Sequence, residues 1–131
     1  MAAMVTRFAP SPTGPLHLGH GYCAVRVHDM ARAAGGRFVL RIDDIDGGRS
    51  RPEFAQGALD SLRWMGLDWD GEPVYQSAHL VHYQRALDDL RAKGLVYACF
   101  CTRSDIAASL SATHGPSGIV YPGNCRDLSA E

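Results

Sequence analysis

The sequence contains no long hydrophobic run. No segment approaches the roughly 20 consecutive apolar residues that a membrane-spanning helix needs. The first residues, Met1 to Val5, have neither the basic start nor the apolar core of a signal peptide. We therefore expect a cytoplasmic protein with no membrane association. Because thiols stay reduced in that compartment, the four cysteines are expected to bind metal or to pack rather than to form disulfides.

An excess of positive charge is also missing. The chain has 13 Lys and Arg residues against 14 Asp and Glu, which gives a formal net charge of −1 at pH 7. This balance excludes a protein that holds nucleic acid through a positive field over its whole surface, so a nucleic-acid partner would need a local basic patch. Lysine is scarce as well, because Lys93 is the only one. With 131 residues, the chain can bury one modest core and is too short for two full domains.

The residues that are present predict an α/β unit at the start of the chain. Residues 5–9 are a short apolar and β-branched run that Pro10 ends, and the prolines and glycine of residues 10–15 predict a stiff loop. Apolar residues then recur at helical spacing from 19 to 34, where two glycines end the helix. A second, buried strand is expected over Arg37–Ile42. Strand, helix and strand at this separation favour a right-handed parallel βαβ unit.

Two more helices are predicted downstream. Ser50 and Glu53 match a capping box for a helix that runs through Met65. Residues 67–76 are interpreted as a connector, because Asp, Gly and Pro are frequent there. Ser77 is then expected to cap the second of these helices. The apolar face of that helix would consist of Leu80, Tyr83, Leu87 and Leu90.

A third strand is predicted over Leu95–Phe100. A short helix near residues 105–110 and a Gly- and Pro-rich segment from His114 to Asn124 are expected to follow it. Three strands fall short of the two βαβαβ halves that make up a doubly wound nucleotide-binding sheet. We therefore expect the chain to be the front half of a longer α/β domain.

A histidine motif stands between the first strand and the first helix. In His17-Leu18-Gly19-His20, two imidazoles lie on neighbouring positions of an opening helical turn, and the glycine lets a ligand approach the backbone closely. The amino terminus of a helix also favours phosphate, because its N–H groups are unpaired and its dipole is positive there. By itself, this short pattern is equally consistent with two solvated or structural histidines.

Residues 7–14, which precede this motif, read Arg-Phe-Ala-Pro-Ser-Pro-Thr-Gly. Together with the His-x-Gly-His signature, this segment closely resembles the corresponding segment of glutamyl-tRNA synthetases, which belong to class I, and of their shortened paralogues. The resemblance implies that ATP is a substrate, accompanied by Mg²⁺, and that His17 and His20 are catalytic. The ATP-binding motif that it implies comprises Pro10, Ser11, Pro12, Thr13, Gly14, Pro15, Leu16, His17, Leu18, Gly19 and His20.

Arg7 and Asp43 are candidate ligands for an acidic amino acid. The guanidinium of Arg7 suits a carboxylate, and a carboxylate at the end of the second strand can hold an α-ammonium group. Without further context, Arg7 reads as a surface residue, and a solvated acidic turn is the main alternative for Asp43. The resemblance implies that L-glutamate is bound by Arg7, Phe8, Ala9, Pro10, Ser11 and Asp43. The family usually has Glu where Asp43 stands, so the side chain here is shorter by one methylene.

Cys99-x-Cys101 and Cys125 predict a metal site. Three thiolates and one further ligand would complete a tetrahedral structural zinc site, for which His114 is the conventional fourth ligand. Three unconnected buried thiols are the alternative. The shortened paralogues, which attach glutamate to queuosine, carry Cys-x-Cys followed by Tyr-x-x-x-Cys. The zinc ligands that this resemblance implies are Cys99, Cys101, Tyr121 and Cys125.

The resemblance spans essentially the whole chain and implies how it is organised. The expected fold class is α/β, a class I synthetase Rossmann-like parallel sheet represented by its N-terminal half. Residues 1–98 would form that half of the catalytic domain, and residues 99–131 would begin a zinc-stabilised insertion. The implied activity is ATP-dependent activation of L-glutamate and its transfer to queuosine in the anticodon of tRNA(Asp). We expect a monomer.

Two alternatives stay open at this point. The chain could be a fragment of a discriminating glutamyl-tRNA synthetase that charges tRNA(Glu), or a non-catalytic, zinc-stabilised fragment that binds nucleotide or tRNA. The family's second half carries a Lys-Met-Ser-Lys-Ser-type loop whose lysine stabilises the transferring phosphate. No lysine follows Lys93 here, so these 131 residues alone are not expected to be complete for catalysis.

Overall fold

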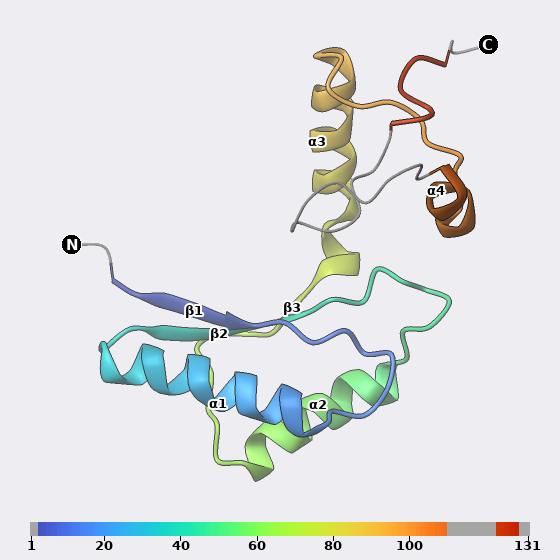
Figure 1. Ribbon diagram of the computed structural model, residues 1–131. Coiled ribbons are helices and arrows are strands. Elements are labelled where there is room, and N and C mark those ends of the chain that lie inside the picture. The colour runs from blue at the N-terminus through green and yellow to red at the C-terminus, as the bar shows by residue number, and fades with distance from the viewer. Residues whose placement is uncertain (1–2, 110–122, 129–131) are drawn as a thin grey trace, which may run out of the picture. The chain divides into compact units, whose positions relative to one another are not determined.

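A computed structural model describes residues 3–109 and 123–128 (Figure 1). The chain divides into two compact units, one up to His82 and one from Tyr83 onward, and each is described by itself. The described residues contain no helix that is both long enough and apolar enough to cross a membrane.

The first unit is a parallel three-stranded sheet with two helices. Its elements follow one another as β1 (Val5–Phe8), α1 (Leu18–Ala33), β2 (Arg37–Ile42), α2 (Pro52–Trp64) and β3 (Val74–Tyr75), and the strand order is β1-β2-β3. All strand pairs are parallel. The predicted βαβ unit is therefore confirmed, and with it the α/β fold class.

Alternation along β2 decides where the core lies. Phe38, Leu40 and Ile42 are buried, whereas Val39 and Arg41 between them are only partly covered. The buried side chains pack against small and apolar residues of both helices, so α1 and α2 cover the same face of the sheet (Figure 1). Those helix residues are Ala24, Ala31, Ala55, Leu59 and Leu62.

Two glycines form the turn from α1 into β2, as predicted. Gly35 has a φ of 60°, which is a left-handed conformation that L side chains rarely adopt. Gly36 lies so close to the chain before β1 that a Cβ atom there would collide with the carbonyl oxygen of Met4. The N–H of Arg37 donates to that same oxygen at 2.9 Å, which starts the pairing of the two strands.

The connector predicted over residues 67–76 is confirmed for residues 67–73, but it is wrong at its end, where the strand β3 lies. The two residues of β3 are too few to show a hydrophobic period, and they pair with Arg41 and Ile42. Asp70 guides the chain to this position, because its N–H donates to the Phe38 carbonyl and its carboxylate accepts the Phe38 N–H, each at 2.8 Å. Contacts between distant parts of the chain thus form the strand.

The two predicted serine caps are also wrong. The N-cap of α2 is Arg51, without a side-chain capping bond, and the Ser50 hydroxyl is buried with no hydrogen-bond partner among the described residues. Pro52 at the first helical position has no N–H that needs a cap, which explains why α2 starts without one. Ser77 lies within a 3-10 turn, η1 (Gln76–His79), and donates to Asp44 instead of capping the next helix.

The second unit carries most of α3 (Leu80–Ala92) and all of α4 (Arg103–Ser109). Gly94, with a φ of 66°, follows α3 and confirms the predicted helix end. The prediction of a strand over Leu95–Phe100 is wrong, because this segment is neither helix nor strand. An apolar run forms a strand only where a partner strand is available, and in the described part of this unit none pairs with it.

Candidate functional site

The loop between β1 and α1 is held in place by two backbone hydrogen bonds. The N–H of Asp43, directly after β2, donates to the Pro10 carbonyl at 3.0 Å. The N–H of Arg51, at the start of α2, donates to the Pro12 carbonyl at 2.9 Å. Both prolines are buried, and their rings restrict φ. The loop is therefore rigid, and it lies at the carboxyl ends of parallel strands, where open α/β sheets bind ligands.

His17 and His20 form the amino-terminal cap of α1. The Nδ1 atom of His17 accepts the N–H of Gly19 at 3.1 Å, and the Nδ1 atom of His20 accepts the N–H of His17 at 3.2 Å. The two rings stack with their centroids 3.8 Å apart. A neutral imidazole that accepts at Nδ1 carries its proton at Nε2, so both rings present an Nε2–H donor. The first turn of α1 has no acidic residue that would repel an anion.

A cavity of about 420 Å³ opens beside these two rings. Its lining comes from the end of β1, the proline loop and the start of α1, and consists of Phe8, Ala9, Pro10, Ser11, Thr13, Gly14, Pro15, His17 and His20. The structure thus brings together most of the predicted ATP motif and four of the predicted glutamate ligands. Pro12 is buried away from this cavity, and the Leu18 side chain is 89% exposed.

The other two predicted glutamate ligands lie on the sheet face opposite α1 and α2. Arg7 is exposed on β1 and is in register with Val39 of β2. Asp43 follows β2 and pairs with Arg41, two residues earlier on that face. Neither Arg7 nor Asp43 lines the cavity beside the histidines. The charged groups of Arg7 and Asp43 and the cavity therefore lie near one another, at the carboxyl ends of β1 and β2.

Asp44 has a role that the sequence did not reveal. Its carboxylate accepts the N–H of Ser77 at 2.8 Å and the Ser77 hydroxyl at 2.6 Å, which ties the acidic loop after β2 to the turn after β3. Desolvation acts to raise the pKa of Asp44, but the hydrogen bonds from Ser77 and from the backbone of Asp44 and Gln76 together outweigh it and hold the pKa below its usual value. The acidic run itself was visible in the sequence, but its partner 33 residues away was not.

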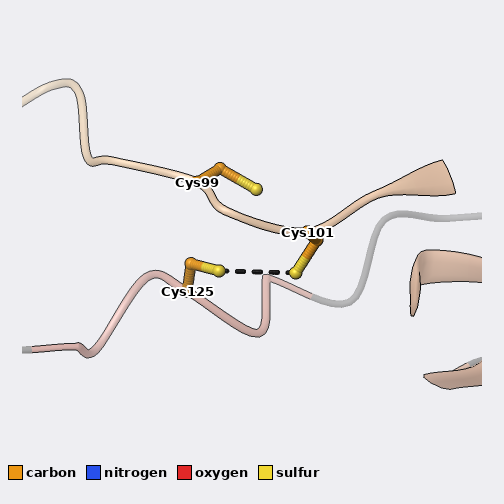
Figure 2. Close-up of side chains that lie close together, drawn as sticks. All are labelled: Cys99, Cys101 and Cys125. Carbon is orange, nitrogen blue, oxygen red and sulfur yellow. Dashed lines mark hydrogen bonds between the residues drawn. The ribbon is translucent and has the colours of Figure 1, made fainter.

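Three cysteines of the second unit converge on one point (Figure 2). The sulfur atoms of Cys99, Cys101 and Cys125 all lie within 4.8 Å of one another, and those of Cys101 and Cys125 are 3.4 Å apart. Tetrahedral zinc with bonds of about 2.3 Å separates its sulfur ligands by about 3.8 Å, which this spacing fits. The hydrogen bond with Cys125, together with desolvation, raises the pKa of Cys101 to about 11. A divalent cation would favour the thiolate again.

Local backbone structure places the third cysteine. Gly123 has a φ of 78°, and its carbonyl accepts the N–H of Arg126 at 2.8 Å, which forms a tight turn around the buried Cys125. Tyr121, the predicted fourth ligand, and His114, the conventional alternative, lie outside the described residues. The structure therefore brings together three of the four predicted ligands.

Comparison with known proteins gives a consistent family. A profile described as the catalytic domain of class I tRNA synthetases (E and Q) matches residues 3–131. The chain is 57% identical over 129 residues to the glutamyl-Q tRNA(Asp) synthetase of Rhodobacter capsulatus. This alignment covers 95% of this chain and 46% of that protein. It is 47% identical to the glutamate–tRNA ligase of Oleidesulfovibrio alaskensis, over 97% of this chain and 28% of that protein.

A solved structure agrees with the sequence relatives. The crystal structure of a glutamate tRNA ligase from Elizabethkingia meningosepticum, in complex with its amino acid, is 32% identical and superimposes with a TM-score of 0.71. The match covers 82% of this chain and 23% of that one. The chain thus spans less than half the length of the relatives that it matches.

Proposed function

Because this chain belongs to the catalytic-domain family of the class I tRNA synthetases for E and Q, we propose that it forms the ATP- and glutamate-binding part of an enzyme that glutamylates queuosine in tRNA(Asp). The observation that carries the proposal is the rigid loop beside the 420 Å³ cavity, with two histidines whose Nε2–H donors are set by the helix cap. A cavity of this size, at the carboxyl ends of parallel strands, suits a small ligand with phosphate groups.

The proposed first reaction needs positioning and charge stabilisation rather than a covalent enzyme intermediate. The α-carboxylate of glutamate attacks the α-phosphorus of ATP, the new bond forms as the bond to pyrophosphate breaks, and glutamyl-adenylate results. Negative charge grows on the oxygens around that phosphorus, where N–H donors of His17 and His20 would stabilise it. Mg²⁺, which we expect to accompany ATP, would neutralise part of the phosphate charge.

Charge complementarity supports L-glutamate as the amino acid. Glutamate has two carboxylates and one ammonium group, and the strand ends offer the guanidinium of Arg7 and the carboxylate of Asp43. We propose that Arg7 binds a carboxylate and Asp43 the ammonium, while Phe8, Ala9, Pro10 and Ser11 form the wall of the pocket. The glutamate tRNA ligase of known structure was crystallised in complex with its amino acid, which supports an amino acid as the ligand.

We propose that the three thiols hold a structural zinc ion. Cys99, Cys101 and Cys125 would be three ligands, and Tyr121 is the proposed fourth. Among the described residues of the second unit, Cys125 is the only buried apolar one, so a metal would supply the stability that burial does not. In this proposal residues 1–98 are the N-terminal half of the catalytic domain and residues 99–131 begin its insertion.

The choice of acceptor follows the relative from Rhodobacter capsulatus, whose 57% identity exceeds the 47% of the glutamate–tRNA ligase. Glutamyl-Q tRNA(Asp) synthetases match at 57%, 47% and 50% identity, from Rhodobacter capsulatus, Symbiobacterium thermophilum and Nocardia farcinica. The glutamate–tRNA ligase of Oleidesulfovibrio alaskensis, at 47%, favours charging of tRNA(Glu) as the second candidate function.

Transfer of radiolabelled glutamate by the whole protein tests the proposal. We expect label on tRNA(Asp) that contains queuosine, and none on tRNA(Asp) without queuosine or on tRNA(Glu). Label on tRNA(Glu) would establish the second candidate instead. An ATP–pyrophosphate exchange assay, with and without glutamate, separates an enzyme from a fragment that only binds nucleotide or tRNA, because only an enzyme forms the adenylate.

A further inference from the structure

We propose that Arg41 is a positioning residue for the amino-acid site, which holds the Asp43 carboxylate in the orientation that receives the α-ammonium group. The inference deepens the proposed function and rests on it. The Nε atom of Arg41 donates to one carboxylate oxygen of Asp43 at 2.6 Å, and Nη2 donates to the other at 3.0 Å. Both side chains are about three-quarters buried, at 28% and 25% exposure.

The backbone and the fork together leave the carboxylate little freedom. The N–H of Asp43 donates to the Pro10 carbonyl, so its main chain is fixed to the loop that forms the cavity wall. The torsion that turns an Asp carboxylate is broad when nothing holds it. A planar, two-point contact with a guanidinium removes that rotation. The position of both carboxylate oxygens therefore depends on Arg41.

The fork does not use up the carboxylate. An ionised carboxylate has about four acceptor sites, of which the two bonds from Arg41 occupy one on each oxygen. At least one site on each oxygen remains for an ammonium group. Orientation matters more for Asp43 than for a Glu, because the shorter side chain cannot correct its position through an additional torsion.

The charges on this face also match the ligand. Arg7 and Arg41 are cations and Asp43 is an anion, and all three lie on the sheet face opposite the helices. The sum is one positive charge, which suits an amino acid with a net charge of −1. If Arg41 only neutralised Asp43, its removal would free the carboxylate and tighten glutamate binding. If Arg41 orients Asp43, its removal weakens binding.

Binding of two ligands to the whole protein distinguishes these possibilities. The two ligands are L-glutamate and glutarate, which lacks the ammonium group. For glutamate, the KM in ATP–pyrophosphate exchange is measured. For glutarate, the inhibition constant in the same assay is measured. We expect Arg41→Met to raise the KM of glutamate about tenfold and to leave the KM of ATP within about twofold. The inhibition constant of glutarate should rise less than the KM of glutamate, because glutarate loses the charge of Arg41 but has no ammonium group that needs the oriented carboxylate. Arg41→Lys keeps the charge but loses the fork, so an intermediate KM is expected.

Two further variants serve as controls. In an Asp43→Glu background, which restores the longer side chain, Arg41→Met is expected to change the KM of glutamate by less than about threefold. Arg63→Met removes an exposed Arg–Asp pair on α2, on the other side of the sheet, and should leave both ligands unaffected. Thermal unfolding of each variant shows that it is folded.

Three outcomes would overturn the inference. An unchanged or lower KM for glutamate in folded Arg41→Met or Arg41→Lys would mean that Arg41 does not orient Asp43. An equal loss of glutarate and glutamate binding would mean that Arg41 contacts a carboxylate of the ligand or only stabilises the fold. If the parent protein neither exchanges pyrophosphate nor binds glutamate, the proposed function fails and this inference fails with it.

Discussion

Replacement of Gly19 by alanine should separate the stability of α1 from the function of its histidine cap. A Cβ atom at this position would lie 3.0 Å from Cε1 and 3.2 Å from Nδ1 of His17. Carbon atoms prefer a separation of about 3.5–4.0 Å, so the His17 ring must move by at least about half an ångström. The ring would then lose its alignment with the Gly19 N–H and with the stacked ring of His20.

The stability terms nearly cancel. Loss of a helix cap costs about 1 kcal/mol, whereas alanine is better than glycine in a helix by about 0.8–1.0 kcal/mol. The free energy of unfolding from urea titration should therefore change by less than about 1 kcal/mol. The displaced donor should matter far more for catalysis, because a misplacement of 1 Å can cost about 100-fold in rate. We expect about a tenfold drop in ATP–pyrophosphate exchange by the whole protein.

Gly57→Ala is the matched control. Gly57 lies inside α2, and an added Cβ would have no neighbour within 4 Å. This variant should gain about 0.5–1 kcal/mol of stability and keep its exchange activity. If Gly19→Ala exchanged pyrophosphate as fast as Gly57→Ala, the argument that the cap positions a reacting imidazole would be refuted.

Three more predictions concern the metal, the acidic loop and the core. Cys125→Ser should lose bound zinc in elemental analysis of the purified protein, whereas Cys23→Ser, at an exposed cysteine on α1, should retain it; stoichiometric zinc in Cys125→Ser would remove that thiol from the site. Asp44→Ala should lose about 1–2 kcal/mol of unfolding free energy at pH 7 through its bonds to Ser77. Because the pKa of Asp44 is lowered by folding, this difference is present above the unfolded value of 3.8 and should shrink as pH falls through the folded pKa; a difference that persists at pH 2 would contradict this account. Phe38→Ala, at a side chain with 0% exposure, should cost about 3–5 kcal/mol by thermal or urea unfolding, and a loss below about 1 kcal/mol would mean that the core is not packed as described.

Most of the first unit could be predicted because its signals are local. The compact apolar run of Arg37–Ile42, the helical period of the preceding segment and the prolines after β1 act within a few residues, and the structure has β1, α1 and β2 where they were expected. The pairing of β3 with β2 could not be predicted from such signals, nor could the absence of a strand at Leu95–Phe100. Whether a short apolar segment becomes a strand depends on a partner strand, and that partner is remote in the chain.

The same division holds for the candidate site. The sequence by itself determined which chemical groups are present: two histidines at the start of a helix, a stiff proline loop and Cys-x-Cys with a third cysteine downstream. Only the tertiary structure decided that Asp44 is bonded to Ser77, and that the Cys125 sulfur lies 3.4 Å from that of Cys101. Motif chemistry depends on residue type and near spacing, whereas the orientation of a charged group depends on neighbours that folding brings to it from elsewhere in the chain.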